Sequence, residues 1–271
     1  ISSCAPYKNL GVPGAKVAHL IAPGYGSPAN LATGTANPFF TRFATSTNTS
    51  VVADALAQNP TFLSLWIGNN DVLGYATSGG DGSNPITPVD GTVGVGFTNT
   101  YNYLVNTLFP AGTTRKGVIA NIPYVTTIPF FNRVPFNPLT TTVLGSGDAA
   151  AGAANVTALN SGLYGPLKQA LTAFGAGDRI NLLSATQANP LLIKDTSLPN
   201  LSAQLTAALT PSLGVATATA FGQIFGQARQ ATSQDLVLLT TSSVIGTAPA
   251  GAPASINKYG ISFPLENKHI L

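Results

Sequence analysis

Residues 62–71 read Phe-Leu-Ser-Leu-Trp-Ile-Gly-Asn-Asn-Asp and decide the fold of this chain. The apolar run that opens the stretch predicts a buried strand, and the Gly-Asn-Asn-Asp that closes it predicts a tight turn. In open α/β sheets, ligands bind where strands end. An asparagine at such a place can donate its side-chain amide to the oxyanion that develops during acyl transfer.

A second candidate turn lies upstream, at residues 9–15, which read Asn-Leu-Gly-Val-Pro-Gly-Ala. A Pro-Gly pair is typical of a tight turn, and glycine leaves the neighbouring backbone N–H groups accessible to a ligand. Together, the two turns predict an acyl-transfer site.

The elements around the first stretch predict a βαβ unit. Apolar residues recur at helical spacing over residues 51–58 and 97–109, and a second buried strand is expected over residues 116–122. Because strand, helix and strand follow one another at this spacing, the sheet should be parallel and the fold class α/β. A glycine-rich loop over residues 74–96 is expected to follow the Asn-Asp turn and to shape the site.

The second half of the chain is predicted to be mainly helical. An alanine-rich helix is expected over residues 148–176, divided near Pro166 and closed by Gly175. Further short elements are strands at 181–184, 191–193 and 235–240 and helices at 201–209 and 215–225. We interpret residues 1–271 as a single domain in which residues 178–232 form an insertion or cap.

Two groups of phenylalanines allow two interpretations each. Residues 39, 40 and 43 either anchor a loop or form a wall that faces substrate. Residues 130, 131 and 136, in a proline-rich loop over 123–138, either pack in the interior or line a lipophilic pocket. That loop and the insertion at residues 178–232 are the expected acyl-binding face.

The composition excludes several classes of protein. Charged residues make up 8% of the chain, against about 25% in typical soluble domains. The chain is nevertheless too apolar for disorder, and its net charge of +3 includes no basic cluster that would indicate nucleic-acid binding. Cys4 is the single cysteine, so neither an intrachain disulfide nor a zinc cluster is expected, and no cofactor is implied. No apolar run is long enough for a membrane span, and the neutral surface favours a secreted, periplasmic or outer-membrane-associated protein.

Neither histidine has the surroundings of a catalytic base. His19 and His269 are both interpreted as structural, although Glu266 precedes His269 by three residues. No Gly-x-Ser-x-Gly elbow is present, and Gly-Ser-Gly-Asp at residues 145–148 does not follow a clear strand. We therefore assign no nucleophilic serine and no catalytic histidine.

The two turn motifs resemble conserved blocks of the SGNH (GDSL-type) hydrolases, in the bacterial lipase and esterase branch. Residues 9–15 are similar to the block Asn-x-Gly-x-x-Gly, and residues 68–71 to the block Gly-x-Asn-Asp. The resemblance implies a three-layer sandwich with a mainly parallel, flavodoxin-like central sheet. It also implies two oxyanion donors, the backbone N–H of Gly14 and the side-chain amide of Asn70.

The same resemblance implies hydrolysis of small-molecule or lipid esters through a serine acyl-enzyme, with contact to a lipid surface. The family blocks that hold the nucleophile, Gly-Asp-Ser, and the base, Asp-x-x-His, are not found in this sequence. Because the chain begins at Ile1 and contains no methionine, we interpret it as a fragment and expect residues 1–271 alone to be inactive. The alternatives are a non-catalytic relative that binds a ligand or carbohydrate, and a structural surface protein.

Overall fold

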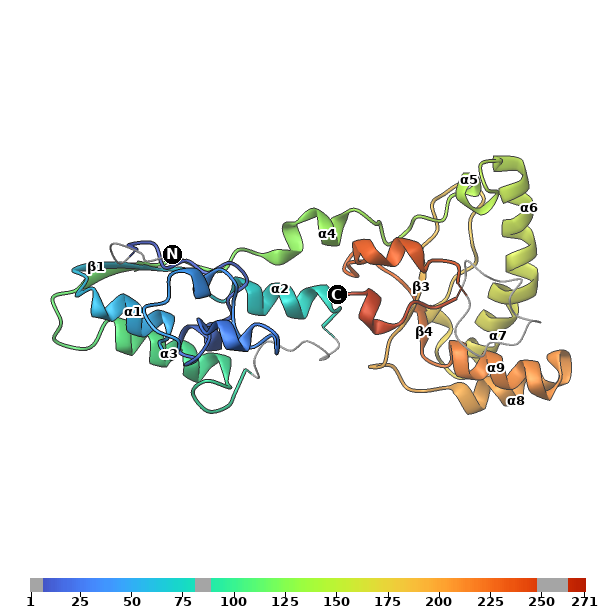
Figure 1. Ribbon diagram of the computed structural model, residues 1–271. Coiled ribbons are helices and arrows are strands. Elements are labelled where there is room, and N and C mark those ends of the chain that lie inside the picture. The colour runs from blue at the N-terminus through green and yellow to red at the C-terminus, as the bar shows by residue number, and fades with distance from the viewer. Residues whose placement is uncertain (1–6, 81–88, 248–262) are drawn as a thin grey trace. The chain divides into compact units, whose positions relative to one another are not determined.

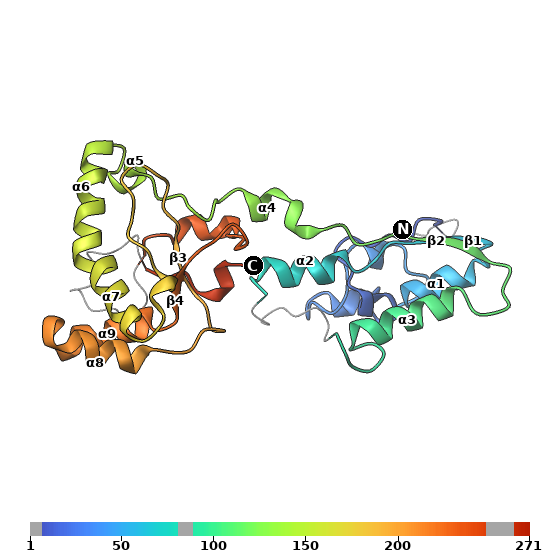
Figure 2. The ribbon, with the colours of Figure 1, turned by 180° about the vertical axis from the view of Figure 1, so that it is seen from behind.

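The computed structural model describes residues 7–80, 89–247 and 263–271 (Figure 1, Figure 2). Contacts divide the chain into two compact units. Unit 1 comprises Ile1–Ala76 and Gly82–Val125, and unit 2 comprises Thr77–Asp81 and Thr126–Leu271. Each unit has a hydrophobic core of its own. This division concerns contacts within the chain, and the interpretation of residues 1–271 as one domain stays a prediction.

Unit 1 is a small α/β structure. Three short 3-10 helices precede its regular elements, at Val17–Leu20, Pro28–Asn30 and Phe40–Arg42. The regular elements are α1 (Val51–Ala57), β1 (Phe62–Leu65), α2 (Asn69–Thr77), α3 (Phe97–Leu108) and β2 (Lys116–Ile119). Ser50 caps α1 by accepting a hydrogen bond from the backbone of Ala53, as a serine at this position favours.

Strands β1 and β2 pair in parallel, with Phe62 opposite Lys116 and Leu65 opposite Ile119. The helix α3 connects them, which confirms the predicted βαβ unit and the two predicted helices at 51–58 and 97–109. The fold is thus mixed α/β with a small parallel sheet, which agrees with the predicted fold class.

The expectation that both strands are buried is wrong. Leu65 and Ile67 are buried in the core of unit 1 together with Val51, Val52 and Leu104 from the helices. On the opposite face of the sheet, Phe62, Trp66 and Val118 are 59%, 63% and 56% exposed. Side chains alternate between the two faces of a strand, and the described helices of unit 1 pack on the face that carries Leu65 and Ile67. An apolar run in the sequence does not reveal that asymmetry.

The predicted Gly-Asn-Asn-Asp turn is also corrected. Helix α2 begins at Asn69, so Gly68 is the one residue of the motif that lies in the connection between β1 and this helix. Gly68 has a φ of +105°, and a β-carbon there would lie 2.7 Å from Ile122 Cδ1, so the bend requires glycine. The predicted loop over 74–96 begins later than expected because α2 continues to Thr77; residues 81–88 of that loop lie outside the described residues.

Unit 2 is mainly helical. Its helices are α4 (Pro129–Asn132), α5 (Thr141–Leu144), α6 (Ala149–Leu159), α7 (Gly165–Ala173), α8 (Ser202–Leu213) and α9 (Val215–Phe225). A π-helical turn at Asn160–Tyr164 joins α6 to α7, and Pro166 lies in the first turn of α7. The predicted division of the alanine-rich helix near Pro166 is therefore confirmed, as is its end at Gly175, which has a φ of +72°. Short 3-10 helices occur at Val125–Thr127, Gly177–Arg179, Leu239–Ser243 and Asn267–His269.

Some of the short elements predicted for unit 2 are present in the structure, and others are not. Helices α8 and α9 and the strand β3 (Leu192–Lys194) confirm three predictions, but β3 pairs antiparallel with β4 (Ala228–Gln230), which was not predicted. The strands predicted at 181–184 and 235–240 are wrong. The backbone of the first segment bonds to side chains instead, for example Leu183 N to Asn160 Oδ1, and the second contributes only isolated bridges at Val237.

The core of unit 2 draws on most of its length. It includes Leu163 and Leu167 together with Ile180, Leu205 and Phe225, so residues 178–232 share one core with α6 and α7. The interpretation of residues 178–232 as an insertion or cap stays a prediction.

Both phenylalanine groups serve in packing. Phe40 is fully buried and meets Phe43 edge to face, which confirms the anchor, whereas Phe39 is 46% exposed. Phe131 is buried against Phe130, and Phe136 packs on the core of unit 2. These contacts favour the packing interpretation for both groups.

Candidate functional site

The turn at Gly14 has the geometry that its sequence favours. Ala15 N donates to Val12 O over 3.1 Å, with Pro13 and Gly14 between them. Gly14 has a φ of +79°, so proline and glycine occupy the two central positions of a type II turn, where each is preferred. The N–H of exposed Gly14 makes no hydrogen bond to another described residue, which leaves it available to a ligand.

The side-chain amide of Asn37 holds this turn in position. Its amide nitrogen donates to Pro13 O over 2.9 Å and to Tyr25 Oη over 3.1 Å. A peptide unit is planar and trans, so a fixed Pro13 carbonyl points the Gly14 N–H in the opposite direction. Asn37 is buried, and its Oδ1 accepts from Phe39 N, so the amide itself is held in place. No motif in the sequence pointed to Asn37; its one sequence signal is the following Pro38, since Asn-Pro marks a turn.

The start of α2 is bonded directly to the Gly14 turn. Asn70 Nδ2 donates to Ala15 O over 2.9 Å, and Val17 N donates to Asp71 Oδ2 over 3.0 Å. These two bonds join residues more than fifty positions apart in the sequence. A primary amide carries two hydrogens, so the bond to Ala15 fixes the Asn70 side chain and leaves its second hydrogen for a ligand. We call the Gly14 turn and the start of α2 together the Gly14–Asn70 site.

Asp71 links α2 to the first 3-10 helix. Its fully buried carboxylate accepts a hydrogen bond from the distant Val17 N. This bond helps to hold the two motifs at a fixed distance from each other.

His19 has a structural environment. Its Nδ1 accepts from Lys16 N over 3.1 Å, and its ring stacks on Tyr25 with the centroids 4.6 Å apart. Burial lowers the pKa of His19, the nearby Asp71 raises it less, and Lys16 lowers it further. A neutral ring that accepts at Nδ1 and is packed on an aromatic neighbour agrees with the structural interpretation.

A cavity of about 760 Å³ lies beside the Gly14–Asn70 site. It is lined by β1 and the residues after it, by Lys8–Val12, and by apolar side chains that include Val51, Val52 and Leu108. Asn69 and Asn70 lie at one end of this lining. Asn69 Oδ1 is buried there and has no hydrogen-bond partner among the described residues.

A second, shallower hollow of about 490 Å³ lies at the end of β2. Phe97, Tyr101, Asn121, Ile122 and Tyr124 line it together with Ala120. Phe97 stacks on Tyr101, and Tyr124 is 85% exposed, so this hollow presents an aromatic surface. Phe97 and Ile122 are also the side chains nearest to Gly68, so the hollow borders the bend that begins the site.

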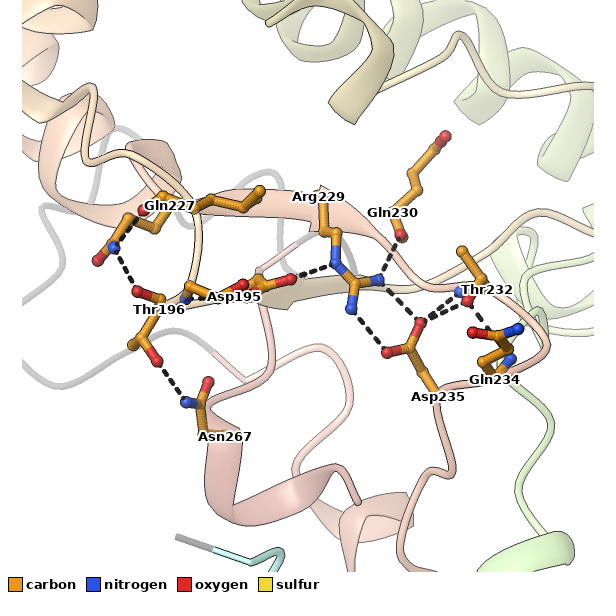
Figure 3. Close-up of polar contacts among 11 residues, drawn as sticks. Asp195, Thr196, Gln227, Arg229, Gln230, Thr232, Gln234, Asp235 and Asn267 are labelled. Atoms are coloured by element: carbon orange, nitrogen blue, oxygen red, sulfur yellow. Dashed lines mark hydrogen bonds and ion pairs between the residues drawn. The ribbon is translucent and has the colours of Figure 1, made fainter.

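The main charged cluster of unit 2 centres on Arg229, whose donors are paired with groups of the protein (Figure 3). Arg229 donates from Nε to Asp195 over 2.6 Å and from Nη2 to Asp235 over 2.7 Å, and its Nη1 contacts Asp235 and the Gln230 carbonyl. Burial raises the pKa of each carboxyl, but hydrogen bonds from Arg229 and from neighbouring Ser197 or Thr232 outweigh it, so the pKa of both is lowered. Because its donors are engaged within the protein, this cluster stabilises the fold.

The described residues contain no group of three histidine, cysteine or acidic side chains that could hold a metal ion. In the same part of the chain, none of the helices is long and apolar enough to cross a membrane.

His269 lies in unit 2. Burial and the nearby Lys268 lower the pKa of its imidazole, and Glu266 acts in the opposite direction.

Comparison of the chain with protein-family models, with curated proteins and with solved structures finds no match. Any functional assignment therefore depends on the residues and geometry of the chain itself.

Proposed function

We propose that this chain is part of an SGNH-type ester hydrolase in which Gly14 and Asn70 stabilise the oxyanion. The observation that carries the proposal is the hydrogen bond between Asn70 Nδ2 and Ala15 O. Two motifs that were singled out separately in the sequence are bonded to each other, each with a donor left over. In acyl transfer, such donors act on the carbonyl oxygen as it becomes negative.

The surroundings support an acyl ester as substrate. The Gly14 N–H and the second Asn70 hydrogen belong to rigid groups, since Asn37 holds the Pro13 carbonyl and Ala15 holds the Asn70 amide. Fixed donors stabilise a developing charge without reorganising during the reaction. The aromatic hollow near Gly68 offers apolar contact to the acyl or alcohol part of an ester.

We also propose that the parallel sheet of unit 1 belongs to a three-layer sandwich. Parallel sheets are normally covered on both faces, whereas the β1–β2 sheet exposes Phe62, Trp66 and Val118. A three-layer sandwich would cover this face. The proposed location is secreted, periplasmic or outer-membrane-associated, because the chain carries so few charged residues.

The test uses the complete natural protein that contains residues 1–271 and measures hydrolysis of p-nitrophenyl butyrate. We expect activity, and Asn70→Ala should lower kcat by about 100- to 1,000-fold with a small change in KM. The matched control is Asn99→Ala, because Asn99 also donates its amide to a backbone carbonyl in unit 1 but lies outside the site. Its kcat should be unchanged.

Two outcomes would contradict the proposal. A complete protein without any ester hydrolysis would favour the non-catalytic ligand-binding alternative. Equal kcat values for Asn70→Ala and Asn99→Ala would remove Asn70 from the reaction.

A further inference from the structure

The peptide unit between Ala15 and Lys16 is held at both of its polar ends. Its carbonyl, Ala15 O, accepts from Asn70 Nδ2 over 2.9 Å, and its N–H, on Lys16, donates to His19 Nδ1 over 3.1 Å. The C=O and N–H of a trans peptide point in opposite directions, so Asn70 and His19 bond to opposite sides of one rigid plane. The peptide unit that fixes the Asn70 amide is therefore itself fixed by His19.

The ring of His19 is held in place for this contact. The backbone N–H of His19 donates to Lys16 O over 3.0 Å while its ring accepts from Lys16 N, so the two residues form a reciprocal pair. The ring also stacks on Tyr25, with the centroids 4.6 Å apart and the planes 26° apart. Tyr25 Oη accepts from Asn37 Nδ2, which also donates to the Pro13 carbonyl of the type II turn. His19 therefore contacts the supports of both proposed oxyanion donors.

We propose that His19 is a positioning residue for the Gly14–Asn70 site, and that protonation of its ring releases the Asn70 amide and inactivates the site in acid. This role rests on the proposed function, because it concerns how the Asn70 donor is held during acyl transfer.

The chemistry of the imidazole explains the effect of a proton. Because Nδ1 accepts from Lys16 N, the neutral ring of His19 carries its hydrogen on Nε2. The imidazolium carries a hydrogen on both nitrogens and cannot accept. The new hydrogen on Nδ1 faces the hydrogen of Lys16 N, so the peptide unit has to turn away. Ala15 O then leaves the Asn70 amide, which loses the bond that fixes its direction.

The environment of His19 places this change below neutral pH. Burial lowers the pKa of the imidazole, Asp71 on α2 raises it less, and Lys16 lowers it. The hydroxyl of the stacked Tyr25 stays neutral, because burial raises its pKa. The His19 ring is therefore neutral at pH 7 and accepts a proton only below the ordinary histidine pKa of about 6.5.

Two helices also pack against the 3-10 helix that holds His19, namely α1 and α3. The one charged residue of α1 is Asp54, whose carboxylate accepts from two threonine hydroxyls. Helix α3 contains no charged residue, and its titratable groups are Tyr101 and Tyr103. Among all of these groups, only a histidine changes charge between about pH 5 and pH 8.

The first measurement follows the N–H of Lys16 directly. The complete natural protein is labelled with 15N-lysine and 13C-histidine and is titrated from pH 8 to pH 4 by NMR. Lys16→Arg identifies the Lys16 signal. We expect the Lys16 amide proton to move upfield with the same midpoint as the His19 ring, because the loss of its hydrogen bond shields it.

Two variants separate the hydrogen bond from other effects of pH. His19→Asn offers an amide oxygen close to where Nδ1 lies, so it keeps an acceptor for Lys16 N but does not titrate, and the Lys16 signal should stay constant. His269→Asn is the matched control, since burial lowers the pKa of both histidines but His269 lies in unit 2. Its Lys16 titration should equal that of the natural protein. If His19→Asn does not fold, the Lys16 midpoint in the natural protein must match the His19 ring and not the His269 ring.

The second measurement is the pH profile of kcat with p-nitrophenyl butyrate. Relative to His19→Asn, the natural protein should lose about tenfold or more in kcat between pH 8 and pH 4, with a small change in KM, as the Asn70 donor loses its position. A catalytic base elsewhere in the protein titrates in both proteins and cancels in this ratio. His269→Asn should give the profile of the natural protein.

Two results would overturn the positioning role of His19. One is a Lys16 amide signal that does not follow the His19 midpoint. The other is a kcat ratio that stays constant across this range although Asn70→Ala lowers kcat. A complete protein without ester hydrolysis contradicts the proposed function instead, and the Lys16 titration then decides whether His19 holds this peptide unit. The two proposals can therefore fail separately.

Discussion

Unit 1 and unit 2 use buried polar groups in different ways. In unit 2 the polar side chains close on each other: Arg229 is enclosed by two aspartates, and Asn189 satisfies the backbone around it. In unit 1, Asn37, Asn70 and Asp71 hold backbone groups in position, while the Gly14 N–H and Asn69 Oδ1 have no partner among the described residues. The charged groups of unit 2 therefore stabilise its fold, whereas the unmatched polar groups of unit 1 are the ones that a ligand could bind.

The two units also differ in how completely their apolar residues are covered. The core of unit 2 encloses Leu163, Leu167 and Phe225 without measurable exposure. In the described part of unit 1, one face of the parallel sheet is exposed, with Phe62 and Trp66 on it. Stability should therefore depend most on the core of unit 2.

The largest expected effect tests the core of unit 2. Leu167→Ala removes a side chain that is 0% exposed and should lower the free energy of unfolding by about 2–5 kcal/mol. The control, Leu182→Ala, makes the same change at a side chain that is 54% exposed and should cost less than about 1 kcal/mol. Urea unfolding monitored by hydrogen exchange in α7 measures both, and similar losses would mean that the core is not closed.

Two buried asparagines compare the units directly. Asn189→Ala, at 4% exposure, leaves Ser184 N without its partner, and Asn37→Ala, at 8%, removes the amide donor to Pro13 O. Each should cost about 1–3 kcal/mol, because partly buried backbone groups lose their hydrogen bonds.

Only Asn37→Ala should also change the Gly14–Asn70 site. In the complete protein we expect it to lower kcat while Asn189→Ala leaves kcat unchanged. Asn37→Asp is a sharper variant, since it keeps an acceptor for Phe39 N but loses the donor to Pro13 O. An unchanged kcat for both Asn37 variants would mean that the Pro13 carbonyl needs no support.

We expect unit 2 to lose stability in acid because Asp195 and Asp235 pair with Arg229. The pKa of Asp195 and of Asp235 is lowered in the folded state, so the unfolded state binds more protons in acid. The stabilisation is complete above the unfolded pKa of about 3.9 and is lost as the pH falls through the lower folded values. Arg229→Leu should remove this dependence and cost about 1–2 kcal/mol at neutral pH, since the pairs are partly exposed.

Melting curves between pH 2 and pH 7 test this comparison. The difference in stability between the natural protein and Arg229→Leu should shrink below about pH 4. A difference that stays constant across this range would show that the ion pairs contribute little.

The smallest expected effect concerns a single glycine. Gly14→Ala should cost about 1 kcal/mol, because φ is +79° although a β-carbon there would meet nothing within 4 Å. Gly112 has the same φ and the same open space but lies outside the site, so Gly112→Ala should cost as much. Trp66 fluorescence during unfolding of unit 1 measures both, and kcat should fall only for Gly14→Ala, whose N–H changes direction.

Neighbouring residues were enough to predict the local elements and the chemistry of the motifs. The periodicity of residues 51–58 and 97–109 predicted α1 and α3, and the Pro-Gly pair predicted a tight turn, because these features depend on residues close in the sequence. The parallel order of β1 and β2 followed from the helix between them. The two motifs are enough to identify Gly14 and Asn70 as candidate donors, since each motif carries its own donor.

Contacts between distant segments determine which strand side chains are buried and which hydrogen bonds the motifs make. Whether Phe62 or Leu65 is buried depends on which face α1 and α3 pack against, and an apolar run contains no such information. The bonds from Asn70 to Ala15, from Val17 to Asp71 and from Asn37 to Pro13 connect residues far apart in the sequence.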